Sequence, residues 1–374
     1  MKVRMPSRRS MQGFSLIELL VAMTITLMVV VAASLVYMSV READSNQSKV
    51  SDSIETGTFA LQLIGRDIAQ AETYPVLMPP TTVYAPLGKT IELHYPPNDW
   101  STYLSSAPYQ LGIFGCDGGT FDTTTATCVA STAMAPYRSA PDSIVINYFS
   151  ADASNTPAGN RDDCSGADTG NDVVNAIRKL NTVPNANTPP TPTVEDKNLP
   201  PYLPVFVSNR YALNDTTTEI DKQVVTTKSL ACNGNGMNGS KPGDAKTANI
   251  YYPILLGVED LQITYGVSPL LVPGSTSMNL TPDRFYKASD VAALDAVKFE
   301  DRDYQPWERV TAVRVCMMTR TLGGSSPIQD KSGAARTYLD CTDDTPQSYA
   351  ANDTSTRKRH VQVFALRNRL TQAY

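Results

Sequence analysis

The stretch that decides the fold is Gly13-Phe-Ser-Leu-Ile-Glu-Leu-Leu-Val-Ala-Met23, near the start of a chain of 374 residues. Four cations and no acidic residue precede it: Lys2, Arg4, Arg8 and Arg9. An apolar run from Phe14 to Val40 follows, and Glu18 is its only charged residue. A carboxylate at the centre of a membrane span costs roughly 2.5–3.5 kcal/mol, so Glu18 is a candidate functional group whose partner must be sought.

The apolar run is long enough to cross a bilayer. As a helix it is about 40 Å long, and a span needs roughly 20 apolar residues. It exceeds the apolar core of an ordinary signal peptide, about 7–15 residues, and no small-x-small site closes it. A cut after Gly13 would remove the basic leader and keep the helix, whereas an uncut anchor is the alternative. The leader cations favour a cytoplasmic N-terminus, with everything after Val40 across the membrane.

These residues resemble the class III signal of type IV pilins and type II secretion pseudopilins, in which a basic leader, Gly, Phe, Glu and a long apolar helix follow in order. The resemblance implies that a prepilin peptidase cuts after Gly13 and N-methylates Phe14. It also implies that Glu18 neutralises a terminal amine when a subunit docks into a filament. The contact is expected between molecules, because the run contains no Lys or Arg.

Composition limits the other functions. The net charge is −5, and loss of residues 1–13 would leave 28 Lys and Arg against 37 Asp and Glu, or −9. This balance argues against broad nucleic-acid binding. The basic cluster Arg357-Lys-Arg359, followed by Arg367 and Arg369, is explained at least as well by a solvated strand edge.

Six cysteines all lie beyond the apolar run: Cys116, Cys128, Cys164, Cys232, Cys316 and Cys341. An even number in a periplasmic domain indicates disulfides, and fifteen pairings are open. The local pairs Cys116–Cys128 and Cys316–Cys341 are preferred, since each closes a loop rich in Gly, Thr and Asp. Cys164–Cys232 would then remain.

The helix is expected to continue past the membrane to about Glu72, because no proline occurs between Pro6 and Pro75. A seam with alternating spacings of four and three indicates an amphipathic second half: Val50, Ile54, Gly57, Leu61, Ile64, Ile68 and Ala71. Polar residues are placed on the other face: Ser53, Glu55, Arg66 and Glu72. We expect this half to pack on its own globular domain, with a homotypic coiled coil as the alternative.

After Pro75 the period changes to two, which indicates strands separated by turns. The expected strands are Thr90–Tyr95, Ser143–Phe149, Val205–Ser208, Ile250–Leu256, Glu259–Val267, Arg309–Thr319 and His360–Leu366. Loops are expected at 116–142, 151–204 and 232–248, and Asn181–Pro204 contains seven prolines. The expected fold is α+β and pilin-like: a cleaved leader (1–13), a transmembrane half-helix (14–40), an amphipathic half (41–72), and a β-rich domain (73–374) with a largely antiparallel sheet.

No catalytic, cofactor or metal site is predicted. The two histidines, His94 and His360, are far apart, and no metalloprotease or nucleophile-elbow motif occurs. Gly234–Gly239 with Ser240-Lys241 has the wrong order for a phosphate loop. Asp162-Asp163, Asp260 and Asp301-Arg-Asp303 lack the spacing of a calcium loop and are interpreted as solvated turns.

Later segments narrow the resemblance. Gly257–Gly266 and Val363–Arg369 are similar to PilW minor pilins, and Arg66–Ala71 is similar to both PilW and the GspJ pseudopilins. PilW-type membership implies a non-enzymatic subunit of a tip complex that primes type IV pilus assembly. A GspJ-like pseudopilin, or a tip adhesin that uses the 97–250 inserts, are the alternatives.

The implied partners are other minor pilins, the major pilin, the prepilin peptidase, an inner-membrane assembly platform and the lipid bilayer, without nucleic acid. The implied location is the bacterial inner membrane before assembly and the pilus tip or cell surface afterwards, where the pilus would serve twitching motility or adhesion.

Overall fold

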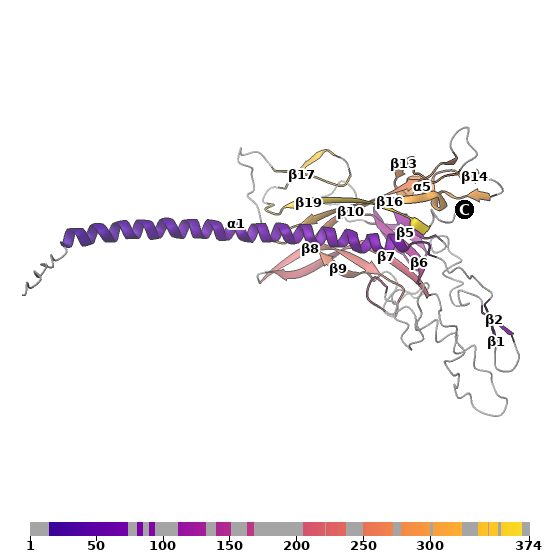
Figure 1. Cartoon of the computed structure of the whole chain (residues 1–374), viewed down its shortest axis with the longest axis horizontal. Helices are drawn as coiled ribbons and strands as arrows, with labels where there is room; N and C mark the ends of the chain where they lie inside the picture. Colours follow the sequence, from indigo (N-terminus) through magenta and orange to yellow (C-terminus); the bar gives the residue numbers. More distant parts are fainter. Residues whose placement is uncertain are drawn as a thin grey trace, which may run out of the picture.

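The computed structural model describes residues 15–73, 81–84, 90–93, 111–131, 140–150, 163–167, 205–220, 222–236, 250–271, 278–299, 302–323, 336–342, 344–350 and 353–368. A single helix, α1 (Leu16–Gln70), projects from a β-rich domain (Figure 1). Its 55 residues correspond to about 82 Å. This matches the predicted helix to within two residues at each end.

One sheet has four antiparallel strands in the order β13-β10-β16-β19. These strands are β10 (Val258–Val267), β13 (Arg284–Tyr286), β16 (Val310–Arg320) and β19 (Arg357–Ala365). Val315 of β16 lies opposite Ile263 of β10 and Gln362 of β19, which fixes the register across the centre of the sheet.

The second sheet has five antiparallel strands in the order β3-β6-β7-β8-β9. These are β3 (Ile113–Cys116), β6 (Ser143–Ser150), β7 (Val205–Ile220), β8 (Gln223–Asn233) and β9 (Tyr252–Leu256). Gly257 links β9 to β10 and therefore joins the two sheets; its φ of +81° is accessible to glycine without strain.

Shorter strands and helices lie outside these two sheets. The two-stranded pairs are β1 (Thr81–Tyr84) with β2 (Thr90–Leu93), β4 (Gly119–Asp122) with β5 (Thr127–Ala130), β11 (Leu270–Leu271) with β12 (Met278–Asn279), β14 (Val297–Phe299) with β15 (Arg302–Tyr304), and β17 (Thr337–Leu339) with β18 (Pro346–Ser348). The helix α5 (Ala288–Ala292) and the 3-10 turn η3 (Pro306–Arg309) complete the described elements.

All seven predicted strands have counterparts, but two expectations differ from the structure. The predicted loop at 116–142 contains the β4–β5 hairpin, whose strands are too short and polar to show a period of two. The strand predicted at Val205–Ser208 continues to Ile220 and turns directly into β8. Threonines fill this extension, and Thr is favoured in strands although it is polar. Most of the predicted loop at 151–204 lies outside the described residues.

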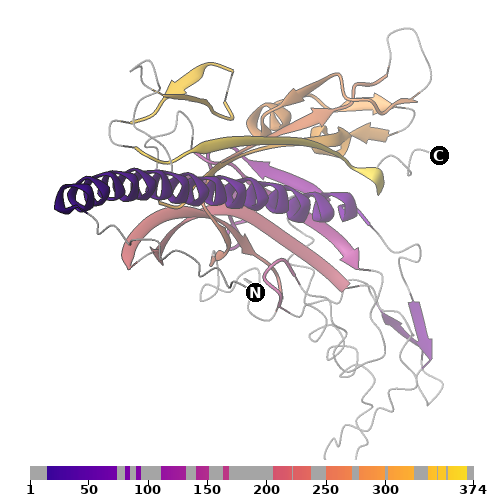
Figure 2. The same ribbon diagram turned by 60° about the vertical axis from the view of Figure 1, so that its left-hand side comes forward.

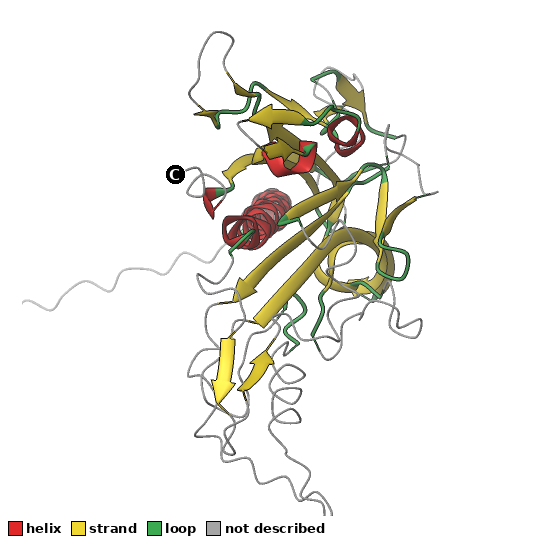
Figure 3. Ribbon diagram, turned by 90° about the vertical axis from the view of Figure 1, so that its right-hand side faces the viewer, coloured by secondary structure: helices red, strands yellow, loops and turns green. Residues whose placement is uncertain are grey.

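The C-terminal half of α1 lies between the two sheets (Figures 2 and 3). One continuous apolar core joins the three parts, with Ile64 and Ile68 from the helix, Ile146 and Tyr211 from one sheet, and Val315 from the other. The predicted packing of this half on its own domain is therefore present within one subunit, and a homotypic coiled coil does not account for it.

Glycines bring the helix onto β19. A Cβ atom on Gly57 would lie 2.3 Å from Nε2 of His360, and one on Gly65 would lie 2.1 Å from Cε1 of Phe364. Both distances are below any ordinary van der Waals contact. The two glycines, eight residues apart, therefore set how closely α1 approaches the strand.

The N-terminal end of the predicted seam differs from the structure. Gly57, Leu61, Ile64, Ile68 and Ala71 are buried, but Ile54 is 42% exposed. The polar face was also partly wrong. Ser53 and Glu72, predicted to be solvent-facing, are buried at 6% and 7% exposure. Polar partners in the sheets satisfy them: Ser53 Oγ donates to Thr319, and Glu72 accepts from the Gly112 N–H.

The glycine contact predicts a loss of stability in Gly65→Ala. Overpacking against the Phe364 ring costs about 1–3 kcal/mol, which exceeds the gain of about 1 kcal/mol from removing a helix glycine. We expect a lower free energy of unfolding for the detergent-solubilised chain, followed by near-ultraviolet circular dichroism. The control is Gln62→Ala, at an exposed position one turn earlier. Equal stability of the two variants would contradict the packing described.

Candidate assembly site

The first described turn of α1 contains Glu18. Ser15 is the N-cap in an extended conformation (φ −71°, ψ 142°), and its carbonyl accepts the Leu19 N–H at 3.1 Å. The Glu18 side chain is exposed, and a negative charge in the first turn interacts favourably with the helix dipole by about 0.3–1 kcal/mol. Gly13 and Phe14 lie outside the described residues, so cleavage and methylation stay predictions.

Glu18 forms none of the ion pairs found among the described residues. The next cation along the helix is Arg41, 23 residues away. At 1.5 Å per residue that is about 35 Å, beyond the reach of any side chain. If residues 1–13 are removed, a cationic partner for Glu18 must therefore be a terminal amine or belong to another molecule.

The N-terminal half of α1 is apolar all round. Its most apolar window has a mean hydropathy of 2.7, and none of that window is buried in the protein. By length and composition this helix can cross a membrane. Its hydroxyl groups donate to helix carbonyls three or four residues earlier, from Thr24, Thr26, Ser34 and Ser39. These bonds satisfy the hydroxyls without water, as a lipid environment requires.

A buried carboxylate joins the other half of α1 to β7. Asp67 is 2% exposed, and its Oδ2 accepts the Tyr211 hydroxyl at 2.7 Å and Asn209 Nδ2 at 2.6 Å. Burial raises the pKa of Asp67 above its ordinary value, although both hydrogen bonds oppose the shift. Sequence reasoning missed this residue, and the only signal was an acid between the apolar positions Ile64 and Ile68.

Two further polar contacts fix α1 to the four-stranded sheet. Thr319 Oγ1 accepts from Ser53 at 2.9 Å and lies 2.9 Å from His360 Nε2. Burial, with a smaller effect of the neighbouring Lys358, lowers the pKa of His360, which favours its neutral form. At the far end, Asn368 Nδ2 donates to the Ala71 carbonyl at 2.8 Å and caps the helix C-terminus. His94, the other histidine, lies outside the described residues.

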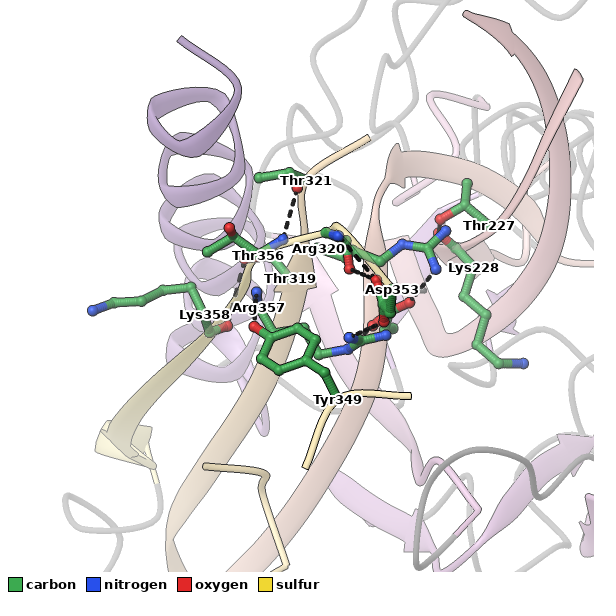
Figure 4. Close-up of polar contacts among 12 residues, drawn as sticks. Thr227, Lys228, Thr319, Arg320, Thr321, Tyr349, Asp353, Thr356, Arg357 and Lys358 are labelled. Carbon is green, nitrogen blue, oxygen red and sulfur yellow. Dashed lines mark hydrogen bonds and ion pairs between the residues drawn. The ribbon is translucent and has the colours of Figure 1, made fainter. Parts of the chain in front are cut away.

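In the predicted basic cluster, Arg357 and Arg359 form ion pairs within the protein, and Figure 4 shows the contacts of Arg357. Arg357 and Arg320 pair with the two oxygens of buried Glu259, at 2.8 and 2.9 Å. Arg357 also pairs with Asp353, and its backbone N–H donates to the Tyr349 hydroxyl oxygen at 2.8 Å. The side chain of Arg357 is only 5% exposed, so the prediction of a solvated edge was wrong at this residue. Its charge holds the β17–β18 segment and is not presented to a phosphate.

Three disulfides join Cys116 to Cys128, Cys164 to Cys232 and Cys316 to Cys341, with Cα–Cα distances of 5.5, 6.0 and 5.7 Å. These are the pairs preferred from the sequence, and no cysteine is free. The first ties β3 to β5, the second ties the 163–167 loop to β8, and the third ties β16 to the segment that follows β17.

Two of the aspartates interpreted as solvated turns are instead buried. Asp163 accepts N–H groups of Ser165, Ala167 and Gly236, and so fastens its loop to the end of β8. Asp260 is 1% exposed and accepts from Gln262, and burial raises its pKa to about 6. Within the described ranges, no group of three or more His, Cys, Asp or Glu could hold a metal ion.

Comparison with known proteins identifies two parts of the chain. Residues 211–368 match the family of type IV pilus-assembly protein W, and residues 8–34 match the prokaryotic N-terminal methylation motif. Residues 211–368 are therefore a PilW-like region, and residues 8–34 a prepilin-type N-terminal motif. The comparison with curated proteins gave no match. Among solved structures, a type IV-like pilin from Thermus thermophilus is 11% identical, with 71% of this chain and 90% of that chain covered at a TM-score of 0.26.

The PilW domain begins and ends at residues that hold the helix. Tyr211, its first residue, binds Asp67, and Asn368, its last, caps α1. Thr319 and His360 lie between them. Together with the methylation motif and a helix long and apolar enough to cross a membrane, the PilW match supports a type IV pilus minor pilin, which is a structural subunit.

The Asp67 joint makes a prediction about stability. Asp67→Ala leaves the Tyr211 hydroxyl and the Asn209 amide buried without an acceptor, at about 1–3 kcal/mol each. Asp67→Asn keeps an oxygen for both donors and should fold like the parent. Chemical denaturation of the full chain in detergent measures both variants. An alanine variant as stable as the asparagine variant would exclude the joint.

Comparison of the parent chain with Asp67→Asn also tests how the free energy of unfolding depends on pH. A raised pKa means that folded Asp67 binds its proton more tightly than the unfolded chain does. Its contribution to stability is therefore full below the unfolded pKa, near 3.9, and is lost as the pH rises through the folded pKa. The stability of the parent relative to Asp67→Asn should fall over that window and stay level above it.

Proposed function

We propose that the chain is a PilW-type minor pilin that joins a small tip complex and primes type IV pilus assembly. A prepilin peptidase would cut after Gly13 and methylate Phe14. The subunit would wait in the inner membrane with its domain in the periplasm, and would reach the pilus tip after assembly. The observation that carries this proposal is Glu18, an acid without a described partner on the N-terminal half of α1, which is otherwise apolar and exposed.

Glu18 gives the subunit a reason to associate. Its charge costs roughly 2.5–3.5 kcal/mol at the centre of a bilayer and less near the interface. A methylated terminal amine on a neighbouring subunit would offset that cost by forming a buried ion pair. Since the amine is created only by cleavage after Gly13, processing would couple directly to docking. The same pair would set the axial register between two neighbouring helices.

The joint between helix and domain supports transmission of that register. Asp67, Ser53 and Asn368 hold one continuous helix to the domain at three heights. A position chosen at Glu18 would therefore place the PilW domain without an intervening hinge. Lateral contacts to other minor pilins and to the major pilin would then be made by the β domain, with an inner-membrane assembly platform supplying the movement.

Two observations support the proposed compartment. The leader cations favour a cytoplasmic N-terminus. Three disulfides beyond the apolar half are typical of an oxidising environment, such as the periplasm. A GspJ-like pseudopilin of type II secretion would share these features. The match of residues 211–368 to the PilW family favours the pilus.

Cleavage is tested by Gly13→Val. A β-branched side chain at the cut site should block the peptidase, so the membrane protein would retain residues 1–13 and an unmethylated Phe14. Intact-mass spectrometry of the purified chain shows both changes. Gln12→Ala, one residue away, should be cut normally. Normal processing of Gly13→Val would refute the assigned site.

Docking is tested by Glu18→Ala. The variant should be inserted, cut and methylated, but it should be missing from sheared pili, and pilus number should drop as in a deletion strain. The matched control is Glu42→Ala, which removes an exposed acid from the same helix beyond the apolar run. Full piliation by Glu18→Ala would remove the pairing argument while leaving the cleavage assignment intact.

A further inference from the structure

The four-stranded sheet ends at β19, which pairs with β16 on one side only among the described strands. The Leu366 N–H donates to the Thr311 carbonyl at 2.9 Å, and the register from there along β19 is unbroken. At the other end, the Thr356 carbonyl accepts from the Thr321 N–H at 3.0 Å. Even-numbered residues therefore bond to β16. Because the direction of bonding alternates along an antiparallel strand, the N–H and C=O groups of the odd-numbered residues point away from it.

These outward groups form an open edge in the C-terminal half of the strand. At its start, the Arg357 N–H donates to the Tyr349 hydroxyl at 2.8 Å, so the segment after β17 covers that end. Val361, Val363 and Ala365 follow. Their backbone N–H and C=O groups have no hydrogen-bond partner among the described residues. Three consecutive outward positions can thus accept one more strand.

The side chains along this edge are apolar. Val361 and Val363 are 52% and 53% exposed. They point to the face of the sheet away from α1, because the alternate residues His360 and Phe364 lie against the helix. Native proteins usually protect a sheet edge with charged residues, proline or a bulge, and residues 361–365 (Val-Gln-Val-Phe-Ala) contain none of these. Such an edge indicates a partner that covers it.

The two ends of the edge are positively charged. From Arg357 to Asn368 the chain has four Lys and Arg residues and no acidic residue. Arg357 and Arg359 form ion pairs within the protein. Lys358 and Arg367 are exposed and take part in none of the ion pairs found among the described residues. A strand with acidic residues near these two positions therefore complements the edge.

A second copy of this chain does not fit the edge. Gly57 lies against the His360 ring and Gly65 against the Phe364 ring, so α1 and β19 run in the same direction (Figures 1 and 2). If two copies paired their β19 edges antiparallel, their helices would point in opposite directions and could not enter one membrane from the same side. Parallel pairing would set two positively charged strands side by side, which is unfavourable.

We propose that the outward edge of β19 at residues 361–365 binds an extended, acidic strand of a different protein, which adds to the four-stranded sheet. The main chain of that strand pairs with the odd-numbered residues, and its apolar side chains lie beside Val361 and Val363. Its acidic side chains lie near Lys358 and Arg367. This inference deepens the proposed function, on whose membrane anchoring it relies, because it assigns the lateral contact of the β domain to one edge.

The test is photo-cross-linking from the edge in living cells that produce the full chain. The photoreactive residue p-benzoylphenylalanine is placed at Val361. The same residue placed at Val224 of β8, which is 75% exposed, measures random collisions. Mass spectrometry maps the cross-linked segment. We expect at least fivefold more adduct from position 361, formed with an acidic, extended segment of a different chain.

Val363→Pro, combined with the cross-linker at position 361, tests pairing through the main chain. It removes an N–H that points outward and none that bonds β16, so the strand should stay in the sheet. Val363→Thr keeps the N–H and a branched side chain, and is the matched control. We expect at least a tenfold loss of adduct with proline and less than a twofold loss with threonine. Near-ultraviolet circular dichroism of the purified chains checks folding.

Charge reversal tests the acidic partner without altering the strand, and it decides the case if the proline variant does not fold. Lys358→Glu with Arg367→Glu should lower the adduct at least threefold. The control is Lys222→Glu with Lys298→Glu, which changes the net charge equally at exposed positions elsewhere. An adduct that is equally strong in both double variants would contradict the acidic partner.

Three other results would overturn the edge contact: an adduct with a second copy, an adduct no stronger than that from position 224, or an adduct that survives Val363→Pro in a folded chain. Pilus number in Glu18→Ala separates this inference from the proposed function. If pili are lost there but position 361 forms no adduct, the edge contact is wrong and the proposed function stands. If pili are normal there and the acidic adduct forms, docking through Glu18 is wrong and the edge contact stands.

Discussion

The rest of the structure depends on the hydrogen bonds that Asp67 makes in the core. A carboxylate at 2% exposure is tolerable only because Tyr211 and Asn209 direct their donors at it. These bonds can form in one rotational setting of α1 and at one height along it. They therefore select a single docking of the helix from the many that an apolar seam alone would allow. Gly57 and Gly65 then permit the close approach that this setting requires.

The two halves of α1 are thus suited to two different environments, lipid and the protein core. In the part of α1 that is N-terminal to Val40, the side chains are exposed all round. The hydroxyl groups there donate to backbone carbonyls of the helix, which suits a lipid environment. C-terminal to Ser53, the helix contributes Ile64 and Ile68 to a protein core that it shares with the two sheets. Because α1 is continuous, the number of residues between Val40 and Ser53 sets the distance between the apolar half of the helix and the domain.

The elements that sequence could predict are those with local signals. Gly13, Phe14 and Glu18 form a compact motif, α1 has helical periodicity without proline, and the core strands alternate with a period of two. The polar joints lack such signals. Asp67 binds Tyr211 across 144 residues, and Glu259 pairs with Arg357 across 98. A buried acidic residue requires a hydrogen-bonding or charged partner, but only the folded structure shows which residue that partner is. The β7–β8 extension was missed because Asn214–Thr218 is a polar run without a period of two, although Thr itself is favoured in strands.

The positions of the disulfides and of the buried polar contacts bear on how such a subunit could leave a membrane. Three disulfides, the Glu259–Arg357–Asp353 pairs and the Asp67 joint all lie within the domain or between it and the upper half of α1. None of them involves residues 16–40. Extraction from the bilayer therefore breaks no described contact inside the protein and requires no refolding. What it exposes is the apolar half of the helix, and only packing against other apolar helices can replace lipid there. If the subunit passes from a membrane into a pilus, as we propose, its apolar half-helix needs a continuous apolar path between the two.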